Sequence, residues 1–361
     1  MTQAQRSNKG SARQNHYWMR AVSFAGLHRI LKSVAVFPNG LRAGEINKLV
    51  QEKSLVFTQR SSGPAPTTLY HYRNTLLRLR TLKRDGLRLR INDDDPDVCK
   101  LLYQPAPANG EQVLSDSARD HFAALVLKNE QCSSLFFDLF MPEGISCSSV
   151  SSFRQNSSPV KWTRHSSCRT REVVFQNDKT GHKAYYTSPA SITAILYGVR
   201  YWARNELGLI DEYCPRADGS VLMFPVSWPR SSPTGIDSPV RQTVRSLLSL
   251  RTPDEWTSFS ILDLIIRFCE ARRRPIRVLF DAIDWLLREW PNHIVLIPTS
   301  RALATLTAPS AQRETLVLRR YYRPSNGPYI SHIRIHKDIA LEPMELIDHH
   351  AQHSSKIQAQ Y

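Results

Sequence analysis

Residues 67–91 read TTLYHYRNTLLRLRTLKRDGLRLRI, and this stretch combines two periodicities. In its first half, apolar residues recur every three or four positions, which predicts an amphipathic helix beginning at a capping residue, Thr67 or Thr68. In its second half, Asp85-Gly86 precedes the alternating residues 87–91, which predicts a tight turn and a half-buried strand. The stretch therefore predicts a helix followed by a basic β-hairpin. The apolar face of the helix is expected to consist of Leu69, Tyr72, Leu76, Leu79 and Leu82.

Two further helices are expected upstream of this stretch. Apolar residues recur at helical spacing in residues 17–34, and Pro38-Asn39-Gly40 then predicts a turn. A short second helix is expected from Leu41 to Val50, with Gly44 near its start. A loop rich in Ser, Gly and Pro, residues 60–66, separates it from the third helix.

Residues 17–91 resemble the winged helix-turn-helix superfamily in the order of their expected elements, which is helix, turn, helix, helix and basic hairpin. The resemblance covers about a fifth of the chain and implies that the third helix is a recognition helix. Arginine can donate two hydrogen bonds to guanine and asparagine can pair with the edge of adenine, whereas a wing contacts the phosphate backbone. The implied nucleic-acid-binding residues are Thr67, Tyr70, His71, Arg73, Asn74 and Arg78 on the helix and Arg84, Arg88 and Arg90 on the wing.

The basic charge of the chain is concentrated in the same region. The whole chain has a formal net charge of +16, and residues 1–91 contain 17 Lys plus Arg but only three acids, Glu45, Glu52 and Asp85. The remaining 270 residues hold 31 basic and 29 acidic residues. The positive side chains of such a basic domain repel one another. Binding to a phosphate backbone relieves this repulsion and releases counterions from the nucleic acid. The distribution therefore predicts a nucleic acid as partner.

Helical and hairpin patterns separated by linkers continue through the rest of the chain. A helix is expected from Ser115 and another from Ser188-Pro189, the latter followed by a hairpin near Asp218-Gly219. Residues 146–168 contain nine serines, which predicts an irregular segment. The expected domains are a basic arm (1–16), the winged helix-turn-helix (17–91), an acidic and Pro-rich linker (92–112), a middle helical domain (113–226), a Pro-rich linker (227–250), a helix-plus-hairpin domain (251–340) and a tail (341–361).

The last of these domains contains a second set of basic residues. Thr252-Pro253-Asp254-Glu255 predicts a capped helix start, and further patterns predict a helix over 278–290, a strand over 293–297 and a hairpin about 325–328. Basic residues interleaved with tyrosines suit a wing or a single-strand stacking surface, although aromatic residues also favour strands in general. The secondary nucleic-acid candidates are Arg272, Arg273, Arg274, Arg319, Arg320 and Arg323.

Cysteine and histidine residues give a weak indication of metal binding. The six cysteines are scattered without a Cys-x-x-Cys pair, which argues against a disulfide framework and predicts a reducing, cytoplasmic location. Cys132, Cys147, His165 and Cys168 are a candidate zinc set because the last two have His-x-x-Cys spacing. Small buried or loop thiols are the alternative explanation, so neither a metal nor a cofactor is expected.

The sequence contains no recognisable catalytic motif. A phosphate-binding Gly-rich loop, a dinucleotide-binding Gly pattern and His-Glu-x-x-His are all missing. Asp281 and Asp284 are the acids considered for a metal-dependent nuclease, and His332 and His336 do not have the spacing of a paired-histidine relaxase. The sequence contains no run of 18 apolar residues that would predict a membrane span. Its first 20 residues contain no apolar segment that would predict a signal peptide.

These observations predict an α+β, mainly helical protein with an N-terminal winged helix-turn-helix and one or two further helix-plus-hairpin domains. The predicted function is non-catalytic binding of DNA, with RNA left open, in a regulator or in the recognition subunit of a larger DNA-processing, mobile-element or defence complex. Other protein subunits are expected partners. An adaptor that uses winged helices to bind proteins and a metal-dependent nuclease are the two alternatives.

Overall fold

The computed structural model describes residues 20, 22–56, 64–129, 132, 138–141, 149–166, 171–177, 181, 183–186, 198–216, 220–227, 239–299, 320–325 and 327–339. The chain divides into two compact units, residues 1–210 and 211–361. It is a mixed α and β protein with more helix than strand, and its sheets are small and antiparallel, as the sequence predicts at that level. Among the described helices, none has the length and apolar character needed to cross a membrane.

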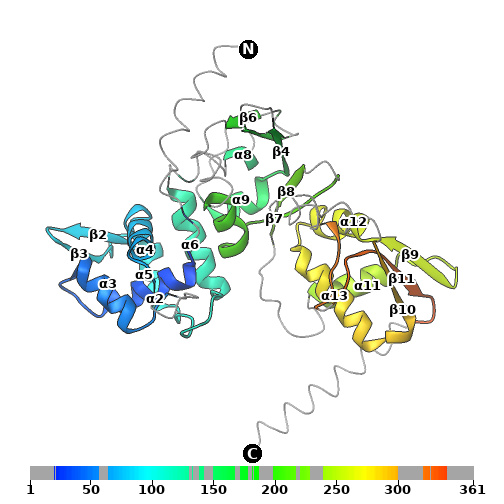
Figure 1. Cartoon of the computed structure of the whole chain (residues 1–361), viewed down its shortest axis with the longest axis horizontal. Helices are drawn as coiled ribbons and strands as arrows, with labels where there is room; N and C mark the ends of the chain where they lie inside the picture. The colour runs from blue at the N-terminus through cyan, green and yellow to red at the C-terminus, as the bar shows by residue number, and fades with distance from the viewer. Residues whose placement is uncertain are drawn as a thin grey trace, which may run out of the picture. The chain divides into compact units, whose positions relative to one another are not determined.

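Residues 22–91, here called the N-terminal module, contain three helices and a three-stranded sheet (Figure 1). The strand order is β1-β3-β2, and both pairings are antiparallel. Strand β3 of the hairpin therefore lies in the middle of the sheet, where it pairs with β2 on one side and with the upstream strand β1 on the other. The elements are α2 (Phe24–Ala35), β1 (Leu41–Arg42), α3 (Ala43–Glu52), α4 (Pro66–Arg78), β2 (Leu82–Asp85) and β3 (Arg88–Ile91).

The predicted order of three helices and a hairpin is confirmed, but several boundaries differ. Leu41 belongs to β1 and not to the second helix, because it pairs with Leu89. Thr67 and Thr68 are not caps: α4 starts at Pro66, whose fixed φ suits a first helical position. Arg80 takes a left-handed φ of 57° that ends the helix, so Leu82 begins β2. Leu87 lies in the turn and is 83% exposed.

Helix α2 lies at the centre of the first unit and is buried along most of its length. The ring of Phe24 lies 5.0 Å from that of Phe122 and 5.1 Å from that of Trp202. Its first amides have partners from distant segments, since Phe24 N–H donates to Glu206 Oε2 at 2.8 Å and Ser23 N–H donates to Tyr72 Oη at 3.0 Å. These contacts fix α4, which carries Tyr72, against α2.

Helices and an antiparallel meander complete the first unit. Helix α6 has the predicted cap, Ser115, and the predicted buried residues, including Ala118 and Phe122. The three strands β4, β5 and β6 pair in chain order. The elements are α5 (Pro96–Tyr103), α6 (Asp116–Lys128), α8 (Asp138–Phe140), α9 (Val150–Asn156), β4 (Val160–Ser166), β5 (Arg171–Asn177), β6 (Lys183–Tyr186) and the π-helical turn η3 (Trp202–Glu206).

Two segments of this unit are more regular than their composition predicts. Residues 92–112 contain helix α5, because the Asp95 side chain accepts from Asp97 N–H and Pro96 occupies the first helical position. The Ser-rich residues 146–168 contain α9 and β4, so the expected irregular segment is wrong over most of its length. A serine caps α9, and strand β4 buries Trp162. The expected start at Ser188-Pro189 lies outside the described residues.

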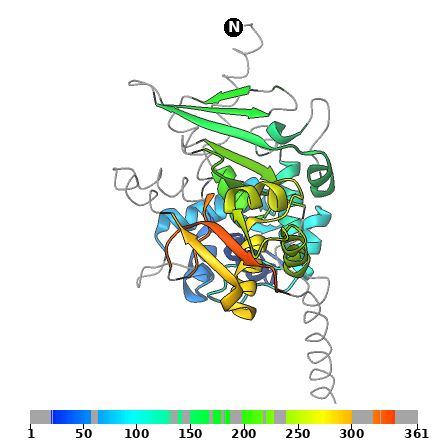
Figure 2. The same ribbon diagram turned by 90° about the vertical axis from the view of Figure 1, so that its right-hand side faces the viewer.

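Residues 239–339, here called the C-terminal module, also combine helices with a three-stranded sheet (Figures 1 and 2). The strand order is β10-β11-β9, again antiparallel, and two neighbouring strands, β7 and β8, precede the module in the chain. The elements are β7 (Ile210–Tyr213), β8 (Val221–Pro225), α11 (Pro239–Leu248), β9 (Trp256–Ser260), α12 (Ile261–Leu264), the π-helical turn η4 (Ile265–Glu270), α13 (Ile276–Glu289), the 3-10 turn η5 (Pro291–His293), β10 (Ile294–Pro298) and β11 (Ile330–His336).

The largest error in the sequence analysis concerns residues 252–260. The predicted capped helix start at Thr252 is wrong, because residues 256–260 form β9 and pair with β11. Thr252 Oγ1 donates to Asp254 instead of capping a helix, and Ser260 caps α12. Helix α11 lies within the expected linker 227–250. Among the described residues 320–325 and 327–330, the hairpin expected about residues 325–328 consists of one antiparallel bridge between Tyr322 and Ile330. The predicted helix over 278–290 and strand over 293–297 are confirmed as α13 and β10.

Burial of His28 in α2 makes the first unit sensitive to acid. His28 is fully buried, its Nε2 lies 3.0 Å from Leu101 O, and desolvation lowers its pKa from 6.5 to about 4. Between these two pKa values the unfolded chain binds a proton that the folded chain excludes, so stability falls as the pH decreases through this window. We expect a loss of about 3 kcal/mol between pH 7 and pH 4 from this residue.

Hydrogen exchange of the α2 amides, corrected for intrinsic rates, measures this loss. His28→Gln should flatten the pH dependence between pH 6.5 and pH 4, because glutamine does not titrate there. His121→Gln is the comparison variant, since it removes a half-buried histidine beside Asp97 from α6 of the same unit and not from α2. Identical profiles for the wild type and His28→Gln would contradict the assignment.

Candidate nucleic-acid interface

The outer face of α4 carries most of the predicted contact residues. Leu69, Tyr72 and Leu76 are buried, as predicted, so the other side of the helix is turned toward solvent. Tyr70 is 53% exposed, and Thr67 and Arg78 are also exposed. His71 and Asn74 are half-buried. Burial, together with Arg20, lowers the pKa of His71, so this side chain is a neutral donor or acceptor at pH 7.

Arg73 has a structural bond that its position in the sequence does not reveal. Its Nη1 donates to Asn47 Oδ1 at 2.8 Å and lies 3.5 Å from Ala43 O, which joins α4 to α3. The guanidinium also lies 5.9 Å from the centre of the Tyr70 ring. Replacing Arg73 would therefore disturb the packing of α3 on α4, and Arg78 is the cleaner probe of this helix.

The three arginines of the hairpin divide between the two faces of the sheet. Arg84 pairs with Leu89, so it lies on the face that turns toward the helices, yet it is exposed near the end of the hairpin. Arg88 and Arg90 lie on the opposite, outward face because side chains alternate along a strand. The predicted wing residues are thus close in the chain but do not form a single surface.

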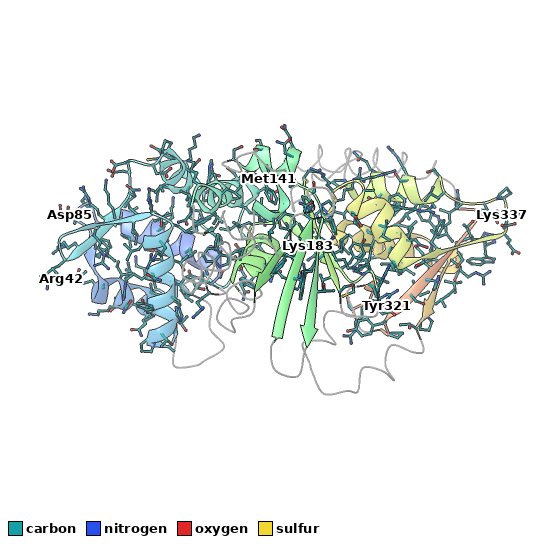
Figure 3. The ribbon with its side chains drawn as sticks, turned by 90° about the horizontal axis from the view of Figure 1, so that it is seen from above. Arg42, Asp85, Met141, Lys183, Tyr321 and Lys337 are labelled. Atoms are coloured by element: carbon teal, nitrogen blue, oxygen red, sulfur yellow. The ribbon has the colours of Figure 1, made fainter. Side chains whose placement is uncertain are left out.

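The outward face of the sheet holds a basic residue that the sequence analysis missed. Arg42 lies directly opposite Arg88 across β1 and β3, and Asp85 lies on the other side of Arg88 in the same row (Figure 3). The next row pairs Lys83 with Arg90. Four basic side chains and one acid therefore share this face, and like charges opposite each other destabilise a sheet.

Neighbouring groups offset only part of this charge. Lys83 Nζ lies 2.6 Å from Asp93 and 2.8 Å from Asp94. Arg90 Nε lies 3.6 Å from Asp85, and Arg88 Nη1 donates to Gly40 O at 2.9 Å. Among the described residues, Arg42, Arg78 and Arg84 have no carboxylate within ion-pair distance of the side chain. No sequence signal locates Arg42, because its partner Arg88 lies 46 positions away.

The secondary arginines are more involved in packing than the sequence analysis predicts. Arg274 is 9% exposed and donates to Thr243 Oγ1 and Gln242 Oε1, so it belongs to the interior of the C-terminal module. Arg272 donates to Ser246 Oγ and lies over the Phe268 ring. Arg273 takes a left-handed φ of 52°, as a residue in a turn. Arg320 and Arg323 flank Tyr321 and Tyr322, and Arg319 lies outside the described residues.

The described part of the chain contains no group of three or more metal-binding side chains. Cys132 is buried and its thiol pKa is raised by desolvation, which favours the neutral thiol over a metal-binding thiolate. Cys147, Cys168 and the side chain of His165 lie outside what the structure describes. Tyr322 donates to Asp284, and Asp281 lies 3.6 Å from Arg277, so both acids have structural partners.

Comparison of the chain with protein-family models, curated proteins and solved structures finds no match. The functional argument therefore rests on the arrangement of the residues themselves.

Proposed function

We propose that the N-terminal module is a winged helix-turn-helix that binds duplex DNA, and that the chain acts without chemistry of its own as a regulator or as the DNA-recognition subunit of a larger complex. The observation that carries this proposal is the surplus of basic side chains at α4 and at the β-hairpin beside it. Arg78 and Arg84 are exposed and have no carboxylate partner among the described residues. On the outward face of the sheet, Arg42 lies opposite Arg88.

Topology supports the winged-helix part of the proposal. Three helices precede the hairpin, and the short strand between the first two helices pairs with the second strand of the hairpin. In such an arrangement the third helix can enter a major groove while the hairpin follows the phosphate backbone. Tyr70, Asn74 and Arg78 would then face the bases. Arg84 and Arg88 would reach phosphates from opposite faces of the hairpin.

Alanine substitution of Arg78 and Arg84 should weaken binding to duplex DNA about tenfold and reduce the dependence of log affinity on log salt by about two. Among the described residues, neither side chain has a hydrogen bond or an ion pair, so we expect the double variant to fold. Fluorescence anisotropy of the full chain from low to physiological salt measures both quantities.

Lys48→Ala/Lys53→Ala is the matched control. It removes two exposed positive charges from α3 and the residue after it, and Lys48 already pairs with Glu52. If both double variants lose equal affinity, the effect comes from overall charge and the assigned surface is wrong. If the wild type shows no salt-dependent binding to duplex DNA, DNA binding itself is contradicted. Parallel measurements with single-stranded DNA and duplex RNA test whether the chain binds other nucleic acids. Adding Mg²⁺ to the same samples tests whether it cuts the DNA.

A further inference from the structure

The C-terminal module repeats the element order of the N-terminal module. Among the described residues of both, a helix is followed by a short strand, two longer helical segments and two strands, if α12 and the contiguous η4 are taken as one segment; the C-terminal module adds the 3-10 turn η5. In both, the last strand lies in the middle of the sheet, because the order β10-β11-β9 corresponds to β2-β3-β1. The two modules therefore have the same topology, although their sequences show no repeat.

The register of the strands makes the correspondence specific. Leu41 pairs with Leu89 in the first sheet, and Phe259 pairs with Ile333 in the second. In each case the following helix begins two residues after the first of these partners, at Ala43 and at Ile261. Leu89 and Ile333 are both buried at the centre of their sheets. Arg334 therefore occupies in β11 the position that Arg90 occupies in β3.

Both modules also carry an excess of basic residues. Residues 22–91 hold 13 Lys plus Arg and three acids, and residues 239–339 hold 16 Lys plus Arg and nine acids. The segment between them, residues 92–238, holds 14 basic and 17 acidic residues. Both modules are thus basic, with formal excesses of ten and seven, and the chain between them is slightly acidic. The excess of the second module is hidden when residues 92–361 are counted together.

We propose that the C-terminal module is a second contact for duplex DNA and binds the phosphate backbone through Arg334 on β11 and Arg323 in the described residues 320–325. This inference rests on the proposed DNA-binding function. Arg334 is exposed and lies over the Trp256 ring, 5.4 Å from its centre, and Arg323 is exposed and lies 4.9 Å from the centre of the Tyr329 ring. Among the described residues, neither has a carboxylate within ion-pair distance.

Stacking on an aromatic ring orients these two arginine side chains before they bind phosphate. A guanidinium that lies on an aromatic face keeps N–H donors along its edge, and the ring restricts its motion before a ligand binds. Arg323 Nε and Nη1 donate to Gly327 O and Tyr329 Oη, both at 3.3 Å, so Nη2 is the donor of Arg323 that has no such partner among the described residues. Helix α13 is less suited to the same role, because its outer side carries Asp281 and Asp284, which repel phosphate. The second contact is therefore independent of base sequence, in contrast to the first.

The test compares salt dependence for the full chain on a duplex of about 40 base pairs, four helical turns. Arg323→Ala/Arg334→Ala should reduce the salt dependence of log affinity by about two and weaken binding to all duplex sequences alike. Arg323→Lys/Arg334→Lys should retain the salt dependence, because the charges remain. Arg245→Ala/Arg288→Ala is the matched control: it removes two arginines from α11 and α13 of the same module and should leave the salt dependence unchanged.

The outcomes separate this inference from the proposed function. If Arg323→Ala/Arg334→Ala behaves like its control while Arg78→Ala/Arg84→Ala still weakens binding, the second contact is overturned and the first stands. If the wild-type chain does not bind duplex DNA in a salt-dependent manner, both are overturned. A loss of salt dependence on substitution in each of the two modules, greater than in the matched controls, supports a chain with two contacts.

Discussion

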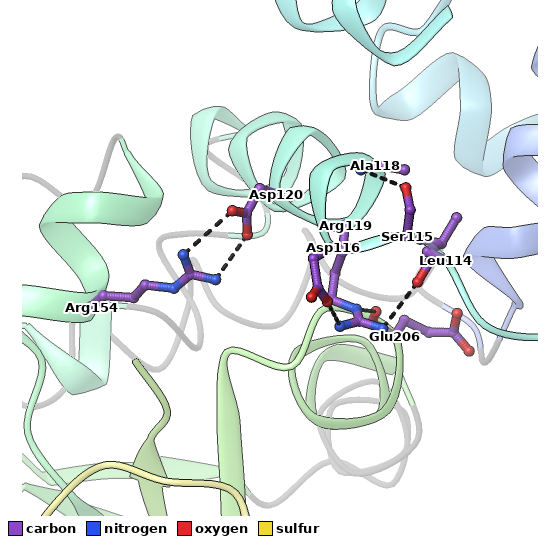
Figure 4. A network of polar contacts seen from close by, with 8 residues as sticks. All are labelled: Leu114, Ser115, Asp116, Ala118, Arg119, Asp120, Arg154 and Glu206. Atoms are coloured by element: carbon purple, nitrogen blue, oxygen red, sulfur yellow. Dashed lines mark hydrogen bonds and ion pairs between the residues drawn. The ribbon is translucent and has the colours of Figure 1, made fainter. Parts of the chain in front are cut away.

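Arg119→Met should lower the free energy of unfolding of the first unit by about 3 kcal/mol, because it removes the cation from a buried polar network. The Arg119 side chain is almost fully buried on α6. It donates to Asp116 Oδ1 at 2.6 Å, to Glu206 O at 3.2 Å and to Leu114 O at 3.3 Å (Figure 4). Methionine fills the space but donates no hydrogen bond, so the substitution removes a donor from each of these oxygens.

Hydrogen exchange of the α6 amides and urea unfolding measure the loss. Arg154→Met is the matched control, because Arg154 also pairs with a carboxylate of α6, Asp120, at 2.8 Å. That pair is more exposed to solvent, with Asp120 at 45%, so we expect a loss of only about 1 kcal/mol. Equal losses for the two variants would show that burial of Arg119 does not determine the energy of the network.

Gly40→Ala should destabilise the N-terminal module by about 3 kcal/mol or more, the second large effect that we predict. Gly40 has a φ of 67°, and a Cβ atom there would lie 2.6 Å from Leu89 O. The backbone of β3 cannot move away without breaking the pairing of Leu41 with Leu89. The carbonyl of Gly40 also accepts from Arg88 Nη1 at 2.9 Å, so the same shift would disturb the outward basic face.

Gly86→Ala separates conformational strain from the steric clash. Gly86 has a similar φ of 57°, but a Cβ atom there meets nothing within 4 Å. Its substitution should therefore cost only the strain of a left-handed residue, about 1 kcal/mol. Both variants are measured by urea unfolding of the full chain and by hydrogen exchange of the β3 amides. If Gly86→Ala is as destabilising as Gly40→Ala, close approach to Leu89 is not the cause.

The sequence predicts those elements whose signals are local. The helix over 66–78 and the turn at Asp85-Gly86 follow from apolar spacing and from a residue pair that favours positive φ, and neither depends on distant residues. Helix α6 is predicted for the same reason, since Ser115 and its buried face lie within one stretch. Such features are specified by residues within a few positions of one another.

Elements that depend on distant partners are not predicted. Strand β1 has only two residues, too few for a pattern, and exists because Leu89 and Arg88 lie beside it. Residues 256–260 have apolar positions that also fit a helix, and their pairing with β11, about 75 residues downstream, makes them a strand. The candidate site shows the same limit. The sequence predicts Arg73 as a nucleic-acid contact, but in the folded chain Arg73 donates to Asn47 and joins α4 to α3.

The sequence by itself determined the basic character of residues 1–91, the helix that carries Arg78 and the hairpin that carries Arg84. Only the tertiary structure decided which basic side chains share a face, because strand pairing brings Arg42 beside Arg88 and separates both from Arg84. It also decided that residues 239–339 repeat the same topology, since two unlike sequences can satisfy one order of strand pairing. Pairing between distant strands is a property of the folded chain, and no local pattern of residues encodes it.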